Sequence, residues 1–556
     1  MSKNDRLIYL PLGGAGEIGM NMYLYGYGPK DNEKFILVDV GVSFPDMESS
    51  PGVDLIMADP TYITDRADRL EAIFITHAHE DHIGALGHLF PRLQAPIYCR
   101  AFTAAIARNK MERAGQDPEM VNEIGMWPET VQTGPFTVGF VPISHSIPEA
   151  SALVIDTPAG RIFHSGDFKI DTNPVVGEAF DADLMQDIAK DGITAFVCDS
   201  TNVFSPEPGR SESSLPPAIT EMMREATGMV VATTFGSNVA RLKTLAQAAV
   251  DAGRSVVVVG RAMNTMINTG QSTGVLTDFP PIMDLEDSKG IPRNQLMVLA
   301  TGSQGERRAA SAQLAQGKYR GLEMKAGDTF LFSSKTIPGN EIGVARIQNL
   351  FAKKGVNVVS GDDRYHVSGH ANRPDLLRLQ ELLNPDLVIP MHGEYRHLRE
   401  HAELAESNNR KAVIAPNGVM LDITNGAKVI ENIDTGRLYL DGSVLIGAMD
   451  GIVRQRLQFA MRGHVVVSLM IDEDQGLVDG VWAEAHGLPE VKHGKNGLDG
   501  LLDEAIDKDL RKAKRGALKD DEAVEMIVLR ACNRVCKAAI GKKPVCTVLI
   551  NRMVSE

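Results

Sequence analysis

Cysteine is scarce in this sequence: 556 residues contain five, and no two of them form a C-x-x-C pair. A disulfide framework or a zinc knuckle needs cysteines at short, regular spacing, so neither is expected. Scattered cysteines are typical of a reducing compartment, and we predict a cytoplasmic protein. No stretch of about 18 apolar residues occurs, so no transmembrane helix is expected. The start, MSKNDRLIYLPLGG, has no basic segment followed by an apolar one, so we expect no secretory signal.

Positive charge is also in short supply. The chain has 57 Lys and Arg residues against 72 Asp and Glu, which gives a formal net charge of −15. This balance argues against a surface coated with nucleic acid, but it allows a local basic channel and suits a site that concentrates metal cations. With 43% hydrophobic residues, the chain is long enough for roughly two to four packed domains.

Short apolar runs that end in polar residues fill the first part of the chain. Five residues able to do chemistry follow such runs: Asp39, His77, His145, Asp167 and Asp199. Side chains at strand ends are fixed by the sheet behind them and open to solvent in front. These strand ends are therefore the first place to look for a site.

The pattern changes near residue 208, where helices begin to alternate with almost continuous apolar strands. This alternation predicts a parallel, doubly wound sheet over residues 209–361. Gly- and Ser-rich loops follow its strands, and such loops suit phosphate because backbone N–H groups can approach closely. Beyond a linker at 431–450, residues 451–556 predict a small α+β domain with a strand, two helices and a terminal strand.

The densest set of metal-ligand residues lies in FITHAHEDHIGAL. His77 and His79 are two residues apart, so in an extended segment they point the same way. Asp81 and His82 follow at a tight corner, where we expect them to face a second metal ion. Imidazole and carboxylate ligands suit Zn²⁺, with Mn²⁺ as the alternative. A polar surface turn would explain one isolated histidine, but H-x-H-x-D-H directly after a strand favours a metal site.

Two metal ions need further ligands, and His145, Asp167 and His392 each follow a later strand. A carboxylate such as Asp167 can bridge two ions roughly 3.5–4 Å apart, the separation typical of two-metal hydrolases. Asp39 is expected to accept a hydrogen bond from a ligand histidine. The predicted metal ligands are His77, His79, Asp81, His82, His145, Asp167 and His392.

This order of ligands resembles the metallo-β-lactamase superfamily. The resemblance implies an αββα sandwich, a dinuclear site with two Zn²⁺ ions, and hydrolysis by a metal-bound hydroxide. The long gap between Asp167 and His392 resembles the insertion that marks the β-CASP group of nucleases. The expected domains are therefore a sandwich from residues 1–208 and 362–430 and a β-CASP domain from 209–361.

Further motifs narrow the resemblance. Seven segments occur along the chain in this order: LPLGGAGEIGMN, HSIPEA, GDFKID, DSTNVFSPEPGRSESS, TFGSN, HVSGHA and PMHGE. Together they resemble the bacterial ribonuclease J family. This resemblance implies a metal-dependent 5′→3′ exoribonuclease with some endonuclease activity, acting on 5′-monophosphorylated, single-stranded RNA in RNA maturation and decay. It also implies a homodimer or homotetramer, and RNA-degradation proteins are expected as partners.

The resemblance also assigns roles at the reaction centre. His370 is the candidate to protonate the leaving 3′-oxygen, and Asp199 would orient it or raise its pKa. Phosphate binding by His370 without proton transfer is the open alternative. Asp81 is assigned to the catalytic group as well as to the metal ligands.

Two loops are predicted to bind substrate. In HVSGHA, Ser and His supply hydrogen-bond donors and Gly lets the backbone approach a phosphate, so the candidates are His366, Val367, Ser368, Gly369 and His370. In TFGSN, Phe235, Ser237 and Asn238 are predicted to contact base and phosphate. An ordinary strand-to-helix turn with Asn238 near the helix cap is the alternative.

A dinucleotide-binding motif is rejected. Gly14 to Gly19 matches G-x-G-x-x-G, but the following MNMYLYGY alternates like a strand and no βαβ unit surrounds it. We predict a glycine-rich turn between strands. Besides a metal-dependent ribonuclease, three alternatives stay open: a small-molecule hydrolase on the same sandwich, a DNA-directed β-CASP nuclease, and an inactive RNA-binding scaffold.

Overall fold

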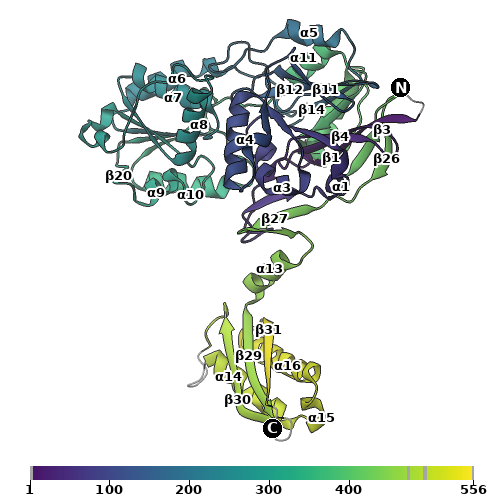
Figure 1. The fold of residues 1–556 in the computed structure, drawn as a ribbon. Helices are drawn as coiled ribbons and strands as arrows, with labels where there is room; N and C mark the ends of the chain where they lie inside the picture. The colour runs from purple at the N-terminus through teal and green to yellow at the C-terminus, as the bar shows by residue number, and fades with distance from the viewer. Residues whose placement is uncertain (1–3, 473–475, 492–496, 554–556) are drawn as a thin grey trace. The chain divides into compact units, whose positions relative to one another are not determined.

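The computed structural model describes residues 4–472, 476–491 and 497–553, which form two compact units (Figure 1). Unit 1 consists of Met1–Ser43 and Ile56–Leu438, and unit 2 of Phe44–Leu55 and Tyr439–Glu556. The predicted sandwich and the predicted parallel sheet both lie in unit 1.

Unit 1 contains a sandwich of two sheets. The first has the strand order β26-β25-β1-β3-β4-β7-β8-β9 and the second the order β10-β11-β12-β13-β14-β23. The strands of the first sheet are β1 (Asp5–Gly13), β3 (Met22–Pro29), β4 (Lys34–Val38), β7 (Leu70–Phe74), β8 (Ile97–Cys99), β9 (Val121–Glu123), β25 (Val419–Asp422) and β26 (Lys428–Asn432). Those of the second are β10 (Thr130–Thr133), β11 (Phe136–Pro142), β12 (Ser151–Thr157), β13 (Gly160–His164), β14 (Ala195–Asp199) and β23 (Val388–Met391).

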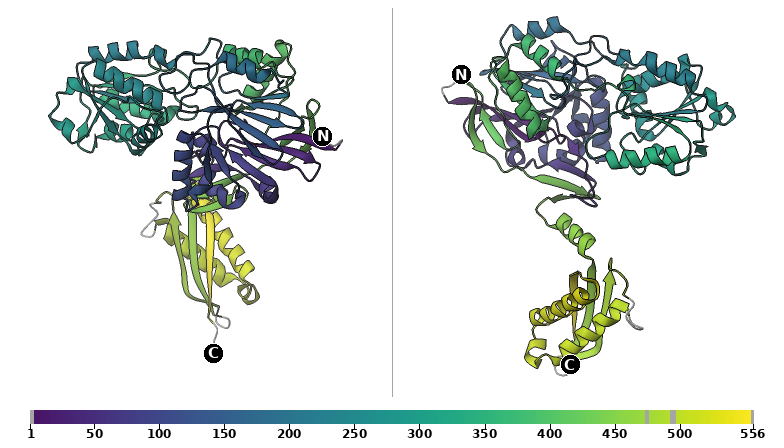
Figure 2. Two further views of the ribbon diagram at one scale, coloured as in Figure 1. Left: turned by 45° about the horizontal axis from the view of Figure 1, so that its top comes forward. Right: turned by 180° about the vertical axis from the view of Figure 1, so that it is seen from behind.

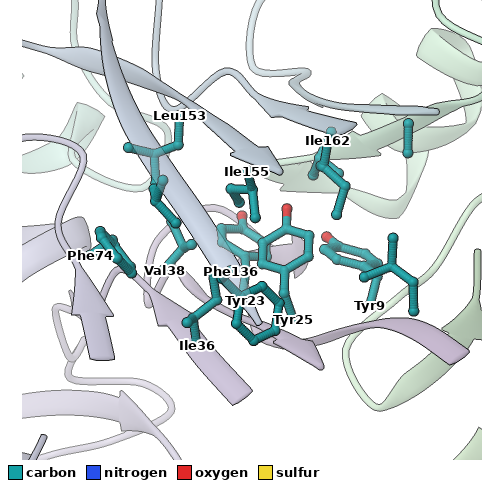
Figure 3. Close-up of a cluster of buried hydrophobic side chains, with 14 of the residues drawn as sticks. Tyr9, Tyr23, Tyr25, Ile36, Val38, Phe74, Phe136, Leu153, Ile155 and Ile162 are labelled. Atoms are coloured by element: carbon teal, nitrogen blue, oxygen red, sulfur yellow. The ribbon is translucent and has the colours of Figure 1, made fainter. Parts of the chain in front are cut away.

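The two sheets pack face to face through large apolar side chains. Tyr9, Tyr25 and Phe74 of the first sheet meet Phe136 and Ile155 of the second, and all five are fully buried (Figure 3). Each such side chain contributes on the order of 1.5–3 kcal/mol when it leaves water. This core fixes the strand ends that carry the candidate site.

Helices cover both outer faces of the sandwich (Figures 1 and 2). The helices beside the first sheet are α1 (Thr61–Thr64), α3 (Leu86–Leu93) and α4 (Ala101–Arg113), and those beside the second are α5 (Ala182–Ala189), α11 (Arg373–Leu383) and α12 (Tyr395–Ser407). The predicted αββα architecture is confirmed. Short elements complete it: α2 (Glu80–Ile83), β2 (Ala15–Gly16) paired with β24 (Gly393–Glu394), and β5 (Val42–Ser43) paired with β6 (Leu55–Ala58).

The inserted part of unit 1 is a parallel sheet with the order β17-β16-β18-β15-β21-β22. Its strands are β15 (Val230–Thr233), β16 (Ser255–Val259), β17 (Ile282–Met283), β18 (Leu296–Ala300), β21 (Thr329–Phe332) and β22 (Asn357–Val359). Helices α6 (Pro216–Glu225) and α7 (Val239–Asp251) lie on one face, and α9 (Ala310–Gln316) and α10 (Glu341–Lys353) on the other (Figure 1). The doubly wound prediction is confirmed.

Unit 1 also contains one further helix, a short hairpin and several 3₁₀ turns. They are α8 (Arg261–Ser272), the hairpin β19 (Lys318–Tyr319) and β20 (Leu322–Glu323), and the 3₁₀ turns η1 (Ala67–Arg69), η2 (Pro118–Met120), η3 (Glu212–Ser214), η4 (Asp287–Gly290), η5 (Arg293–Gln295) and η6 (Asp363–Tyr365). The glycine-rich segment from Gly14 to Gly19 lies between β1 and β3, so the predicted turn between strands is confirmed.

Unit 2 is a three-stranded sheet with the order β30-β29-β31, covered by α14 and α16 (Figure 2). Its elements are α13 (Ile452–Arg462), β29 (His464–Asp472), β30 (Gly476–His486), α14 (Gly497–Lys512), α15 (Arg515–Leu518), α16 (Asp521–Ile540) and β31 (Val545–Met553). The sequence analysis missed β30 because Asp479 and Gly480, both at positive φ, interrupt its pattern.

Two strands lie within the segment predicted as a linker at 431–450: β27 (Arg437–Asp441) and β28 (Val444–Gly447). This segment therefore has regular structure. Among the described residues, no helix is both long and apolar enough to span a membrane.

Candidate metal centre

One group of candidate ligands brings together His77, His79, His145 and Asp167. His79 Nδ1 lies 3.1 Å from His77 Nε2 and 3.0 Å from His145 Nε2. Asp167 Oδ2 is 3.7 Å from both His77 Nε2 and His145 Nε2. Four ligand atoms from three separate segments therefore converge on one point.

A second group joins Asp81, His82, Asp167 and His392. Asp167 Oδ2 lies 3.2 Å from His82 Nε2 and 3.4 Å from His392 Nε2. Asp81 Oδ2 is 3.7 Å from His82 Nε2 and 3.6 Å from His392 Nε2. Because the same Asp167 oxygen belongs to both groups, it occupies the position of a ligand that bridges two metal ions.

Strand ends supply most of these side chains. His77 and His79 follow β7, Asp167 follows β13, and His392 follows β23. The tight corner expected at Asp81 and His82 is instead the short helix α2, whose backbone turns both side chains toward the centre. His392 has φ = 49°, an unusual value for a non-glycine residue and one often found at functional sites.

In His77, His82 and His145, the Nδ1 atom makes a hydrogen bond on the side away from the centre. His82 Nδ1 donates to Asp39 at 2.7 Å, and His145 Nδ1 donates to the Gly369 carbonyl at 2.6 Å. His77 Nδ1 lies 3.0 Å from the hydroxyl of Thr76, which itself donates to Asp39. In these three rings the contacts place the proton on Nδ1 and turn Nε2 toward the centre, a tautomer that suits metal binding. His79 instead turns its Nδ1 toward the centre.

Asn21 was not predicted from the sequence, and it organises the second group. Its Oδ1 accepts from His392 Nδ1 at 2.8 Å and from the Tyr23 hydroxyl at 2.7 Å. Its Nδ2 donates to the Asp81 carbonyl at 3.1 Å and lies 3.0 Å from His82 Nε2. One buried amide thereby orients three ligand residues. It lies in the LPLGGAGEIGMN motif, the one sequence signal that could have indicated it.

In the first ligand group the protonation preferences fit cation binding. Burial, reinforced by neighbouring histidines, holds the pKa of His77 and His145 well below the usual range, and burial lowers the pKa of His79 to about 4. Neutral imidazole is the form that binds metals. Asp167 Oδ1 is buried without a hydrogen-bond partner among the described residues. In this group an orphaned carboxylate oxygen and converging unprotonated nitrogens are the donor set that Zn²⁺ or Mn²⁺ prefers. In the second group burial opposes protonation of His82, but Asp167, Asp81 and Asp39 raise its pKa, so a cation bound there would displace its proton.

His370 and Asp199 form a pair beside these ligands, and with Asp167 and His392 they make a third group whose ligand atoms lie close together. His370 Nδ1 donates to Asp199 Oδ2 at 2.8 Å, and Asp199 Oδ1 accepts from the Thr201 amide and hydroxyl. Burial opposes protonation of His370, but the carboxylates of Asp199 and Asp167 outweigh it and raise its pKa to about 9. The His370 side chain is 22% exposed and that of Asp81 30%, against 2% for Asp167. The centre is therefore open on the side of Asp81 and His370.

The HVSGHA loop lies directly against the ligands. An added Cβ at Gly369 would come within 2.9 Å of His145 and 2.8 Å of Ser146, so only glycine fits here. Ser368 Oγ accepts from Asn202 at 2.8 Å and from the His370 amide at 3.2 Å, which leaves its own proton available for a ligand. Val367 is buried and His366 is partly buried.

The TFGSN loop connects β15 to α7. Phe235 and Ser237 are partly exposed, whereas Asn238 is buried and caps α7 by accepting the Arg241 amide at 2.9 Å. A cavity beside this loop reaches the HVSGHA loop and the metal centre, with His145, Ser146, Lys169, Asn238, Val367 and Ser368 among its lining residues. The sequence analysis did not single out Lys169, which is buried and paired with Asp171 at 2.8 Å.

Known protein families match this chain in four places. The descriptions are "Beta-lactamase superfamily domain" at residues 36–189, "Ribonuclease J, beta-CASP domain" at 227–351, "Zn-dependent metallo-hydrolase RNA specificity domain" at 355–416 and "Ribonuclease J C-terminal domain" at 451–553. Together they extend over both units.

Individual relatives agree. Ribonuclease J of Sinorhizobium meliloti is 37% identical over 557 residues, which cover 100% of this chain and 98% of that protein. Ribonuclease J of Mycolicibacterium smegmatis is 36% identical, with 84% of this chain and 83% of that protein covered. A crystal structure of a protein of unknown function from Enterococcus faecalis V583 is similar with a TM-score of 0.52 at 17% identity, covering 75% of this chain and 99% of that chain. At that identity the last likeness concerns the fold alone.

Proposed function

This chain belongs to the ribonuclease J family, and from the geometry of its site we propose that it degrades 5′-monophosphorylated RNA from the 5′ end with a two-metal centre. The observation that carries the proposal is the Asp167 oxygen shared by two ligand groups, with His370 and Asp199 on the open side. We propose two Zn²⁺ ions, or Mn²⁺ in their place. One would be held by His77, His79, His145 and Asp167, and the other by Asp81, His82, Asp167 and His392.

Divalent ions bound there would lower the pKa of a coordinated water and stabilise negative charge on the phosphoryl oxygens. The protein's own groups do the rest. His370 keeps Nδ1–H on Asp199, so its Nε2 is free to hold a proton for the leaving 3′-oxygen. Hydrolysis of the bond between phosphorus and this 3′-oxygen gives one product with a 5′-phosphate and one with a 3′-hydroxyl.

The HVSGHA and TFGSN loops are proposed to bind the RNA. Ser368 offers a free hydroxyl proton and Gly369 a close backbone approach, next to the cavity that His145 also lines. A terminal 5′-phosphate bound there would place the first phosphodiester at the metal centre. This geometry supports release of single nucleotides. Phe235 and Ser237 are proposed to contact the first nucleotide across the same cavity.

Four RNA and DNA substrates of one sequence test the proposal with the full-length protein and Zn²⁺ or Mn²⁺. They are 5′-monophosphate RNA, 5′-hydroxyl RNA, circular RNA and single-stranded DNA. We expect mononucleotide release, fastest from the 5′-monophosphate RNA, and slower cuts in the circle from endonuclease action. The Asp167→Ala variant, purified identically, controls for contaminating nucleases.

Equal degradation of DNA would favour a DNA-directed nuclease instead. Intact RNA in every lane would overturn the ribonuclease proposal and favour a small-molecule hydrolase or a scaffold. The homodimer or homotetramer, the RNA-degradation partners and the cytoplasmic location stay predictions.

A further inference from the structure

Arg241 is the largest side chain in the described chain that is fully buried. It lies in the first turn of α7, directly after the TFGSN loop. Its guanidinium donates to the Glu212 carboxylate through both Nε and Nη2, the latter at 2.9 Å. Nη1 donates to the Ser333 carbonyl at 2.7 Å and lies 3.1 Å from the Ser333 hydroxyl. These contacts connect α7 to η3 and to the end of β21.

The same guanidinium also reaches the beginning of the HVSGHA loop. Nη1 lies 3.4 Å from the Tyr365 carbonyl and 3.3 Å from His366 Nδ1, and Nη2 lies 3.4 Å from the Val367 carbonyl. The Ser333 hydroxyl adds a 2.6 Å hydrogen bond to the Tyr365 carbonyl. One arginine thus joins both chain connections of the inserted sheet, the one entering near Glu212 and the one leaving at residues 365–367.

A buried guanidinium is costly unless all of its donors are satisfied. Each nitrogen of Arg241 has an acceptor, so the cluster is fully paired and its geometry is fixed. Lysine would preserve the positive charge, but it lacks the planar fork that reaches Glu212, Ser333 and the loop at once.

Two contacts hold the His366 ring. Its Nδ1 lies 3.3 Å from Arg241 Nη1, and the ring also hydrogen-bonds to the Ser333 backbone. Burial, together with Arg241, Lys335 and Lys169, lowers the pKa of His366 to about 3, so the ring is neutral. His366 is therefore a neutral ring whose orientation is fixed by Arg241 and Ser333.

We infer that Arg241, held by Glu212, is a positioning residue for recognition of the terminal 5′-phosphate. It fixes the backbone of residues 365–367 and the orientation of the His366 ring, so that the loop meets the phosphate in one geometry. This inference rests on the proposed function. It predicts that loss of the arginine fork weakens 5′-end recognition and leaves the metal ligands and the chemical step in place.

The test compares Arg241→Lys with Arg254→Lys in the full-length, metal-loaded protein. Arg254 is a matched control: it is buried in the same inserted domain and donates to the carbonyls of Met223, Gly228 and Leu296, none of which lines the cavity. The readout is the ratio of kcat/KM for 5′-monophosphate RNA to that for 5′-hydroxyl RNA of the same sequence. Metal content and the melting temperature are measured in parallel.

For Arg241→Lys we expect the ratio to fall about tenfold or more, mostly through KM, as for one misplaced hydrogen bond to a charged group. Arg254→Lys should keep the wild-type ratio even if it lowers the melting temperature equally. A folded Arg241→Lys with the wild-type ratio would overturn the inference. Should that variant not fold, Glu212→Gln decides, because it keeps the side-chain size and is expected to shift the ratio in the same direction.

The wild-type protein separates this inference from the proposed function. If the wild type shows no preference for 5′-monophosphate RNA, the proposed function is wrong. If the wild type prefers the 5′-monophosphate and both Arg241→Lys and Glu212→Gln keep that preference, only the proposed role of Arg241 is wrong. Competition by inorganic phosphate gives an independent readout: it should inhibit the wild type and Arg254→Lys more strongly than Arg241→Lys.

Discussion

Two buried polar clusters flank the HVSGHA loop, and they differ in how their hydrogen bonds are satisfied. In the metal centre, His79 Nδ1 lies within 3.1 Å of both His77 Nε2 and His145 Nε2, and Asp167 Oδ1 has no partner among the described residues. Around Arg241, every nitrogen has an acceptor, and the charge of Glu212 balances that of the guanidinium.

This difference indicates what each cluster is for. A buried acceptor without a donor costs roughly 1–3 kcal/mol, so an arrangement with several of them is stable only when something positive binds between them. A fully paired cluster gains nothing from a ligand and serves to fix the chain. We therefore expect the metal centre to respond strongly to cations and the Arg241 cluster to respond only through the loop that it holds.

The largest effect should come from Asp167, the one carboxylate shared by both ligand groups. We expect Asp167→Ala to lose bound metal and to lose RNA cleavage to background, because neither ion keeps its full ligand set. Elemental analysis and nucleotide release are the measurements. Asp191→Ala, which changes an exposed carboxylate in the same sandwich, should behave as the wild type. If the wild type cleaves RNA equally well after exhaustive chelation, the centre does not act through bound metal ions and the comparison of the two clusters fails.

The next effect concerns proton transfer rather than metal binding. We expect His370→Ala to lower kcat about 10²–10⁴-fold, the usual contribution of a general acid, while the metal content stays at the wild-type level. The matched control is His88→Ala on α3, since His88 belongs to neither ligand group. If metal is lost together with activity, His370 acts as a ligand and the metal centre is larger than described.

The sequence allowed the parts of the metal centre that lie at strand ends to be predicted. The sequence shows these residues because histidine and aspartate are typical metal ligands: they are the H-x-H-x-D-H motif and the later His145, Asp167 and His392. The sheets of the sandwich bring them together. The fold class and the parallel inserted sheet were predictable for a similar reason, because strand and helix periods are local properties. The domain bounds at 208, 361 and 430 stay predictions.

The residues that the sequence did not reveal are those whose role depends on distant partners. Asn21 is a neutral amide, and its link to His392 depends on the pairing of β2 with β24. Arg241 lies in an amphipathic helix, where an arginine is normally expected at the surface. Its burial depends on Glu212 and residues 365–367, which no local pattern connects to it.

A smaller effect is expected at Asn21. Loss of a partner that orients metal ligands typically costs about 10–100-fold in metal affinity or activity, so Asn21→Ala should weaken metal binding by that amount. Titration of the apoprotein with a chromophoric zinc competitor measures it. Asn122→Ala is the control, because that amide contacts only the carbonyls of Ile97 and Met120. Equal zinc affinity in Asn21→Ala and the wild type would show that Asn21 does not orient the ligands.

The smallest expected effect separates the two clusters by their thermal response. Free Zn²⁺ at about 100 times its dissociation constant should stabilise the wild type by about 2.7 kcal/mol, because only the folded chain holds the ligands together. Asp167→Ala should lose this increment. Arg241→Lys should start from a lower melting temperature, since a buried ion pair has been weakened, yet keep the zinc increment because no predicted ligand changes. Loss of the increment in Arg241→Lys would mean that the loop transmits strain to His145 through Gly369, and that the two clusters form a single cooperative site.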